Sequence, residues 1–176
     1  MNYNFLIWNV RGLNDPVRRS VVCAAIRKHN VTIVCLQETK LQVIDINIVK
    51  QCCGPQFSDF CYAPADGTRG GILVAWIPAE FQCTIKLLSP WSIAVHGLLS
   101  QSNTNLNLLA VYGPQSDADK ALFLQELQAR IAADLPPATA TIITGDFNMI
   151  VKASDKNNLN LNRRNMTKFR KFINDL

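Results

Sequence analysis

Residues 141–148 have the sequence Thr141-Ile142-Ile143-Thr144-Gly145-Asp146-Phe147-Asn148. The apolar and β-branched start predicts a short buried strand, and Gly145 predicts a turn at its end. If the backbone stays extended, Asp146 and Asn148 project to one side and Phe147 projects to the other, into packing. An acid and an amide held side by side at the end of a strand can orient a water and stabilise a phosphate. On these eight residues alone, a loop that uses Asp and Asn for turn chemistry is an equal alternative.

The composition is that of one globular domain. The chain has 176 residues, of which 48% are hydrophobic and 18% are charged, so it can bury a sizeable core. No apolar run reaches the roughly 20 residues that a membrane span requires. The N-terminus has no signal-peptide pattern. We therefore expect an intracellular protein with no membrane partner, and the sequence does not distinguish the nucleus from the cytoplasm.

The cysteines are predicted to be reduced thiols. They form no paired C-x-x-C units, and no histidine or cysteine stands at the spacing of a zinc site. In an intracellular protein we therefore expect core thiols with no disulfide partner. The six positions are Cys23, Cys35, Cys52, Cys53, Cys61 and Cys83.

The net charge of +5 lies entirely in the last segment of the chain. Residues 1–150 hold 11 basic and 11 acidic residues, whereas residues 151–176 hold seven basic and two acidic residues. Such a segment attracts polyanions by neutralising phosphates. The alternative is a solvated helix face, which is a common fate of a charge run.

The N-terminal third predicts a βαβ unit. An apolar run at 5–8 ends at Asn9, a helix is expected over 17–29, and a second buried strand at 32–37 ends at Glu38. The helix should bury a stripe of Val21, Val22 and Ala25 together with the isoleucine that follows. The two strands should be parallel neighbours with Asn9 and Glu38 at their C-terminal ends, where open α/β sheets place their sites.

The remainder predicts further strands and three helices. A helix over 43–53 and a strand over 57–63 precede a tight turn at 66–71 and a strand at 72–76. Strands at 81–88, 92–99 and 106–112 should form an antiparallel meander. A helix over 118–133 should begin at a capping-box variant, Ser116 with Asp119, bury Leu122 on its apolar side and stop at Pro136-Pro137. A polar loop to Asn165 and a basic helix over 166–176 end the chain.

Four stretches, in order, resemble the endonuclease/exonuclease/phosphatase (DNase I-like) family. Each places a polar residue at the end of an apolar strand: Asn9, Glu38, Tyr112-Gly113-Pro114 and Gly145-Asp146-Phe147-Asn148. The resemblance implies a four-layer α/β sandwich, in which two packed, mainly antiparallel sheets are flanked by helices, as a single domain over 1–176. Within the family, the stretches Trp8 to Asn14, Gln37 to Lys40 and Gly70-Gly71 most resemble endonuclease domains of plant LINE-type (non-LTR) retrotransposons.

The resemblance also implies site residues. Glu38 resembles the metal-binding glutamate, with Asn9 beside the metal, and the metal would be Mg²⁺, with Mn²⁺ as a substitute. Tyr112 resembles the tyrosine whose hydroxyl approaches the scissile phosphate. Asp146 resembles the acid that orients or deprotonates the attacking water. Asn148 resembles the amide that stabilises the transition state.

The sequence departs from the family pattern near its end. A complete family member continues to a C-terminal Ser-Asp-His motif and a further Asp, which these 176 residues do not contain. His29 ends a predicted helix and His96 lies within a strand, so both are interpreted as structural. We therefore expect a domain incomplete at the C-terminus, with an unpaired sheet edge, exposed apolar surface and a tendency to aggregate.

These observations leave three functional hypotheses. The first is a Mg²⁺-dependent retroelement endonuclease that nicks DNA, is impaired by truncation, and is fused to a reverse transcriptase in a complete parent protein. In it, Lys40, Arg163 and Arg164 would contact nucleic-acid phosphates. The second keeps the chemistry but acts on abasic DNA, RNA or inositol phosphates. The third is a catalytically dead remnant that at most binds nucleic acid.

Overall fold

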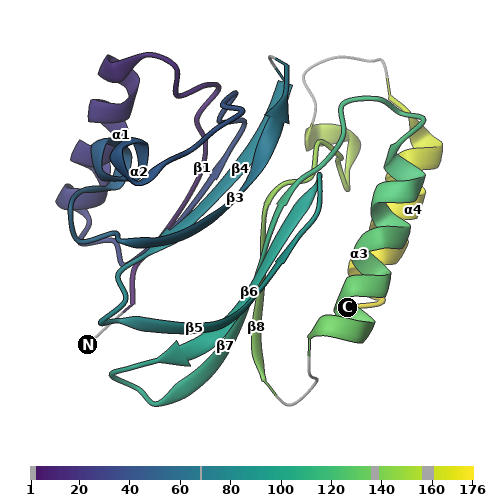
Figure 1. Cartoon of the computed structure of the whole chain (residues 1–176). Helices are drawn as coiled ribbons and strands as arrows, with labels where there is room; N and C mark the ends of the chain where they lie inside the picture. The colour runs from purple at the N-terminus through teal and green to yellow at the C-terminus, as the bar shows by residue number, and fades with distance from the viewer. Residues whose placement is uncertain (1–2, 68, 136–138, 156–160) are drawn as a thin grey trace.

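A computed structural model describes residues 3–67, 69–135, 139–155 and 161–176. Two four-stranded sheets pack face to face, and a pair of helices covers the outer face of each (Figure 1). This four-layer α/β arrangement is the fold class that the sequence predicts. Helices α1 (Pro16–Lys28) and α2 (Ile46–Cys53) cover the first sheet, and α3 (Lys120–Asp134) and α4 (Arg163–Asn174) cover the second.

The first sheet contains the predicted βαβ unit. Its strands are β1 (Phe5–Asn9), β2 (Ile33–Gln37), β3 (Asp59–Asp66) and β4 (Arg69–Trp76), in the order β1-β2-β4-β3. Strands β1 and β2 are parallel, with Asn9 opposite Gln37, so the residue after each apolar run emerges at the same edge. Strand β4 returns antiparallel to both β2 and β3.

The second sheet contains the predicted meander. Strands β5 (Phe81–Leu88), β6 (Ser92–Leu99) and β7 (Thr104–Tyr112) are antiparallel neighbours, and β8 (Ala140–Asp146) lies parallel to β7. Helix α3 provides the connection between β7 and β8, as a parallel pair requires. In the resulting register Tyr112 stands opposite Asp146.

Three apolar layers hold these elements together. The first lies between the first sheet and its helices and includes Leu36 and Phe57. The second lies between the sheets and includes Trp76 and Phe81, whose rings meet edge to face at 5.8 Å. The third lies under α3 and α4 and includes Phe123. Because both faces of each sheet are covered, the inner strands β2, β6 and β7 are buried on both sides, whereas the outer strands β3 and β5 alternate between more buried and more exposed positions.

The outer strands of the two sheets meet. Strand β1 pairs with β2 and β8 pairs with β7 in the described sheets, and β1 and β8 also contact each other across the sandwich. Both strands are less buried than β2 and β7, and Ile7 on β1 is 38% exposed. This contact brings the polar ends of β1 and β8, Asn9 and Asp146, to one place.

The predicted helix starts and buried stripes were wrong in detail. Helix α2 begins at Ile46, because the Asp45 side chain accepts the Ile48 amide hydrogen and caps it. Helix α1 buries Val22, Cys23 and Ile26, whereas Val21 is 53% exposed, so its buried stripe is rotated from the predicted one.

The predicted capping box of α3 does not form. The helix begins at Lys120, and in the described structure Asp119 makes no side-chain cap. The Ser116 hydroxyl instead accepts from the Ala118 amide. Phe123 is buried in place of Leu122, which is 58% exposed. The predicted stop at Pro136-Pro137 lies outside the described residues.

Two other boundaries also differ from prediction. The turn expected over 66–71 is shorter, since β3 reaches Asp66 and β4 begins at Arg69. Gly70 therefore pairs with Ala65 inside the ladder. Helix α4 begins at Arg163 rather than at 166, because the Asn162 side chain accepts the Asn165 amide hydrogen.

The histidines and cysteines occupy structural positions. His29 ends α1, and its amide donates to the Ala25 carbonyl. The buried His96 ring lies 2.7 Å from Asn107 Oδ1. All six cysteines are free thiols, and burial raises the pKa of Cys35 to about 12. Among the described helices, none is long and apolar enough to cross a membrane.

Candidate active site

The polar ends of β1 and β8 are joined by a hydrogen bond. Asn9 Nδ2 donates to Asp146 Oδ2 at 2.8 Å, across 137 positions of sequence. Both residues line an open hollow of about 410 Å³ between the two edge strands, together with Gln37, Phe147 and other neighbours. An acid and an amide from different sheets therefore share one cleft that solvent can reach.

A left-handed turn, and not an extended strand, places Asn148. The backbone of Asn148 has φ +49°, so the condition under which Asp146 and Asn148 would share one extended line is not met. Its amide nitrogen donates to Asp146 Oδ1 at 2.9 Å, and its Nδ2 donates to the Gly113 carbonyl at 2.7 Å. As predicted, Phe147 packs into the third core layer, with its ring 5.1 Å from that of Phe169.

Tyr112 lies next to two carboxylates. Burial raises the pKa of the Tyr112 hydroxyl, a hydrogen bond with Gln115 lowers it by less, and the nearby charges of Glu38 and Asp146 raise it further. The hydroxyl therefore stays protonated at neutral pH and can donate a hydrogen bond. The predicted catalytic tyrosine thus has the protonation state that a donor to a phosphate requires.

Glu38 is the carboxylate that the sequence predicts as a metal ligand. It follows β2 directly, its side chain is 19% exposed, and Lys40 Nζ lies 3.2 Å from its Oε1. Asn9 Oδ1 accepts from the Arg11 amide at 3.2 Å and has a second lone pair. Carboxylate and amide oxygens suit Mg²⁺, which keeps several waters.

A metal bound here would take few ligands from the protein. Within the described ranges, no group of three or more His, Cys, Asp or Glu side chains is arranged to hold a metal ion. Water or phosphate oxygens would have to complete the shell, which is the usual way that Mg²⁺ binds at phosphate sites.

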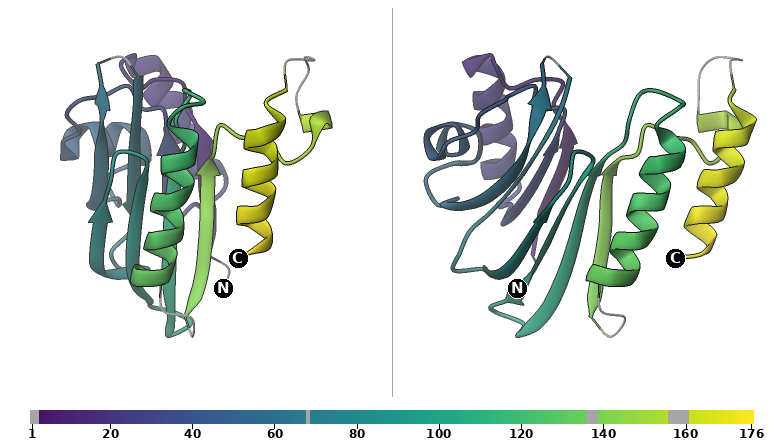
Figure 2. Two further views of the ribbon diagram at one scale, coloured as in Figure 1. Left: turned by 90° about the vertical axis from the view of Figure 1, so that its right-hand side faces the viewer. Right: turned by 45° about the vertical axis from the view of Figure 1, so that its right-hand side comes forward.

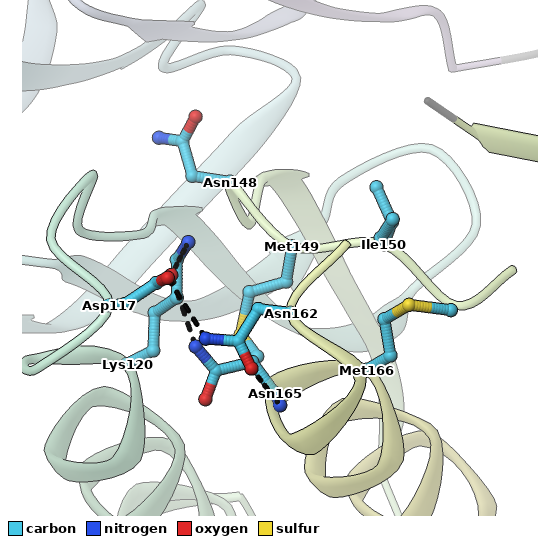
Figure 3. Close-up of a pocket in the computed structure, with 8 residues that line it drawn as sticks. All are labelled: Asp117, Lys120, Asn148, Met149, Ile150, Asn162, Asn165 and Met166. Carbon is cyan, nitrogen blue, oxygen red and sulfur yellow. Dashed lines mark hydrogen bonds and ion pairs between the residues drawn. The ribbon is translucent and has the colours of Figure 1, made fainter. Parts of the chain in front are cut away.

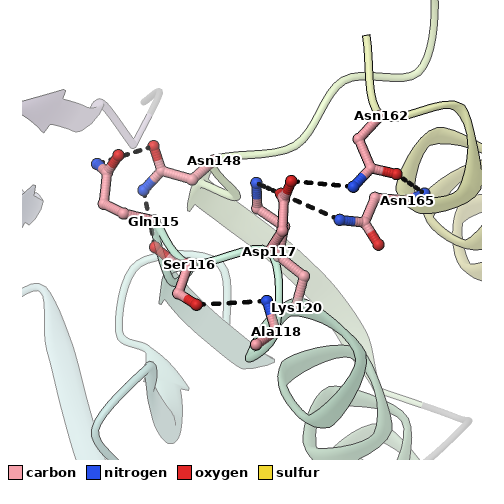
Figure 4. A network of polar contacts seen from close by, with 9 residues as sticks. Gln115, Ser116, Asp117, Ala118, Lys120, Asn148, Asn162 and Asn165 are labelled. Carbon is pink, nitrogen blue, oxygen red and sulfur yellow. Dashed lines mark hydrogen bonds and ion pairs between the residues drawn. The ribbon is translucent and has the colours of Figure 1, made fainter.

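A polar network connects this cleft to the basic helix α4 (Figure 4). Gln115 Nε2 donates to Asn148 Oδ1 at 3.3 Å. Gln115 stands two residues before Asp117 in the chain. The Asp117 carboxylate accepts from Lys120, Asn162 and Asn165, at 2.7, 2.9 and 3.1 Å.

Asp117 keeps its charge at neutral pH. The Lys120 ammonium, followed by Asn162, lowers the pKa of Asp117 to about 2. The carboxylate therefore stays ionised and keeps the start of α4 beside the start of α3.

The network surrounds a small cavity of about 160 Å³ that adjoins Asn148 (Figure 3). It is lined by Asp117, Lys120, Asn148, Met149, Ile150, Asn162, Asn165 and Met166. Arg163 and Arg164 follow Asn162 directly and are exposed on the first turn of α4. Helices α3 and α4 run roughly parallel and contact each other (Figure 2).

Comparison with known proteins identifies the family. The family model described as the endonuclease/exonuclease/phosphatase family matches residues 6–173. The chain belongs to this family. Every candidate site residue named above lies within the matched range.

Solved structures of family members share the fold. The apurinic/apyrimidinic (AP) endonuclease LMAP of Leishmania major superposes with a TM-score of 0.72 at 16% identity, over 98% of this chain and 66% of that one. The APE2 catalytic domain of Xenopus laevis gives 0.66 at 16% identity, over 97% and 66%. A mannosyl-6-phosphatase of Bacteroides thetaiotaomicron gives 0.60 at 16% identity, over 84% and 66%. The chain spans about two thirds of the length of these structures.

Sequence reasoning missed three contributors to the site. Gln115 contacts Asn148 but stands one residue beyond the Tyr112-Gly113-Pro114 motif. Asp117 is an acid in a polar loop, and no local signal marks it as the anchor of a helix more than 40 residues later. Thr39 is fully buried between two predicted site residues, Glu38 and Lys40.

Proposed function

We propose that this chain is a Mg²⁺-dependent phosphodiesterase domain that nicks DNA, of the kind found in LINE-type retrotransposons. The observation that carries the proposal is the Asn9–Asp146 hydrogen bond at the meeting point of the two sheets. It places Asp146 beside Asn9 in an open hollow, and Tyr112 lies close enough to Glu38 and Asp146 for their charges to raise the pKa of its hydroxyl. Family membership supports phosphoester chemistry, and the choice of DNA rests on the sequence resemblance and the basic helix.

Glu38 and Asn9 would hold the metal. When bound, Mg²⁺ would supply positive charge where negative charge grows on the phosphate. The Lys40 ammonium already neutralises Glu38 in part, so metal binding has to displace or share this ion pair. An open cleft that leaves room for waters fits an ion that dehydrates reluctantly.

The remaining residues act on the water and the phosphate. Asp146 would accept a proton from the attacking water, whose oxygen forms a bond to phosphorus as the ester P–O bond breaks, and the leaving oxygen would take a proton from solvent. Asn9 and the Asn148 amide each donate to Asp146 and hold it in place. Tyr112 and Asn148 would donate to phosphate oxygens as charge develops there.

Nicking of supercoiled plasmid in Mg²⁺ tests the proposal. We expect slow but measurable conversion to the open circle by the wild-type chain, and a loss of about 10²-fold or more in the Glu38→Gln variant. Glu80→Gln is the matched control, because Glu80 undergoes the same change near the start of β5 and bonds Gln101, away from the cleft. Equal rates for the wild type and Glu38→Gln would contradict the assignment.

Other outcomes of the same assay separate the alternatives. Activity on abasic DNA, RNA or inositol phosphates without plasmid nicking would keep the site and change the substrate. Binding of DNA with no turnover on any substrate would support a catalytically dead remnant. Fusion to a reverse transcriptase in a complete parent protein is part of the same proposal, and it rests on the resemblance to LINE-type endonuclease domains.

The basic helix makes a separate prediction about DNA affinity. Replacing Arg163 and Arg164 together with alanine should reduce the slope of log affinity against log salt by about 2, because two phosphate contacts are lost. Arg27→Ala with Lys28→Ala is the matched control, since these two exposed cations end α1 on the other side of the sandwich. Equal changes in slope for both pairs, in fluorescence anisotropy titrations, would show that total charge matters rather than this helix.

A further inference from the structure

We infer that Gly71 is a positioning residue for Glu38 and that it acts by leaving room for the Thr39 side chain. The inference rests on the proposed function, in which Glu38 is the metal-binding carboxylate. It concerns residues of β4 and of the loop after β2, 33 positions apart along the chain.

The segment that carries Glu38 has an unusual backbone. Glu38 and Lys40 have φ values of +56° and +57°, in the left-handed region that non-glycine residues rarely adopt. Such conformations cost free energy and persist where the surrounding structure enforces them. The direction of the Glu38 side chain therefore depends on whatever holds this segment.

One side of the segment is held by the loop after β1. The Gly12 amide donates to the Glu38 carbonyl at 2.7 Å, and the Leu13 amide donates to the Thr39 carbonyl at 2.8 Å. These bonds use the carbonyl groups of Glu38 and Thr39. The backbone amides of Thr39 and Lys40 are free to bond on the opposite side of the segment.

The other side is held by the start of β4. The Thr39 amide donates to the Gly71 carbonyl at 3.2 Å, and the Lys40 amide donates to the Gly70 carbonyl at 3.0 Å. Any displacement of Thr39 away from Gly71 therefore moves the residue immediately after Glu38.

Thr39 fills the space that a side chain at position 71 would need. Its side chain is fully buried, and its hydroxyl has no hydrogen-bond partner among the described residues. A Cβ atom added at Gly71 would overlap Thr39 Oγ1 and lie 3.4 Å from the Cβ and nitrogen of Ala65. Because the hydroxyl bonds to nothing here, the volume of Thr39 is what matters.

Gly70 separates this overlap from simple backbone strain. Gly70 and Gly71 have φ values of +74° and +89°, so alanine is strained at either position. A Cβ at Gly70 would meet Tyr112 Cε1 at 3.8 Å, an ordinary contact. Gly70→Ala therefore carries the strain without the overlap.

The test measures Mn²⁺ binding by calorimetry on the whole chain, so that turnover is not needed. We expect Gly71→Ala to weaken Mn²⁺ affinity by about 10- to 100-fold, as loss of support for a metal ligand typically does. Gly70→Ala should change it by about twofold at most. Circular dichroism checks that each variant is folded.

A second substitution at Thr39 identifies the cause. Thr39→Ala removes the overlapping atoms and should restore most of the affinity of Gly71→Ala, whereas Thr39→Val keeps the volume and should restore none. If Gly71→Ala does not fold, the two double variants still test the inference. Thr39→Ala with Gly71→Ala relieves the overlap and should fold and bind Mn²⁺, whereas Thr39→Val with Gly71→Ala keeps the overlap and should not.

The outcomes distinguish this inference from the proposed function. Unchanged Mn²⁺ affinity in Glu38→Gln would overturn the proposed metal role. Weakened binding in Glu38→Gln with normal binding in Gly71→Ala would overturn the inference alone. Equal losses in both double variants would also overturn it, because relief of the overlap would then have no effect.

Discussion

Replacing Asp146 with asparagine is expected to lower the rate of DNA nicking by about 10³-fold while the fold is retained, because a proton acceptor is lost at constant size. Asparagine keeps one oxygen to accept from the Asn148 amide, which now bonds Asp146 Oδ1 at 2.9 Å. Its amide nitrogen replaces the oxygen that accepts from Asn9. The Asn9 side chain has to turn, which adds a small positional change to the chemical one.

The control for this change is Asp59→Asn. Asp59 is exposed at the start of β3, where it pairs in register with Trp76, at the end of the first sheet opposite to Asn9. Its substitution should leave the nicking rate unchanged. Initial rates on supercoiled plasmid, with circular dichroism of both variants, provide the comparison. Retention of more than about a tenth of the wild-type rate in Asp146→Asn would remove Asp146 from proton transfer.

Replacing Gly145 with alanine should destabilise the protein by about 4 kcal/mol, since backbone strain and overpacking act together. Gly145 has φ +134°, a conformation that alanine adopts only under strain. An added Cβ would overlap the Val111 carbonyl oxygen and lie 2.9 Å from the Val111 carbonyl carbon and nitrogen. Those atoms belong to β7 and have no freedom to retreat, so β8 would have to separate from β7.

The matched control is Gly67→Ala, which should cost about 1 kcal/mol, the ordinary penalty for alanine in a left-handed conformation. Gly67 has φ +59°, and a Cβ there would meet nothing within 4 Å. Urea unfolding followed by tryptophan fluorescence gives both free energies of unfolding. Equal values would mean that the close approach of β8 to β7 can relax at little cost. The Gly145 variant should also lose Mg²⁺-dependent nicking, because Asp146 is the next residue.

We expect the isolated chain to aggregate through the exposed edges of its sheets. Strands β1 and β8 each have one paired neighbour in the described sheets, and Ile7 on β1 is exposed. Unpaired edges of this kind promote association between chains.

The order of the elements was largely predictable because it depends on local properties. Apolar runs that end in a polar residue predicted β1, β2 and β8, and the helix between the first two predicted their parallel pairing. The starts of α2 and α4 were not predicted correctly, because capping by Asp45 and Asn162 outweighs the hydrophobic pattern. The conformation of Asn148 did not follow from the strand pattern either, since its backbone is left-handed.

Local sequence patterns are enough to show that polar residues end the strands, and they place Asn9, Glu38, Tyr112, Asp146 and Asn148 at or just after those ends. Which of these residues contact one another depends on the three-dimensional fold. The Asn9–Asp146 bond joins two sheets, and the fit of Thr39 against Gly71 joins a loop to a strand. Such contacts depend on strand register and on how two faces pack, and these are set by the summed burial of side chains throughout the core. No short stretch of sequence contains that information.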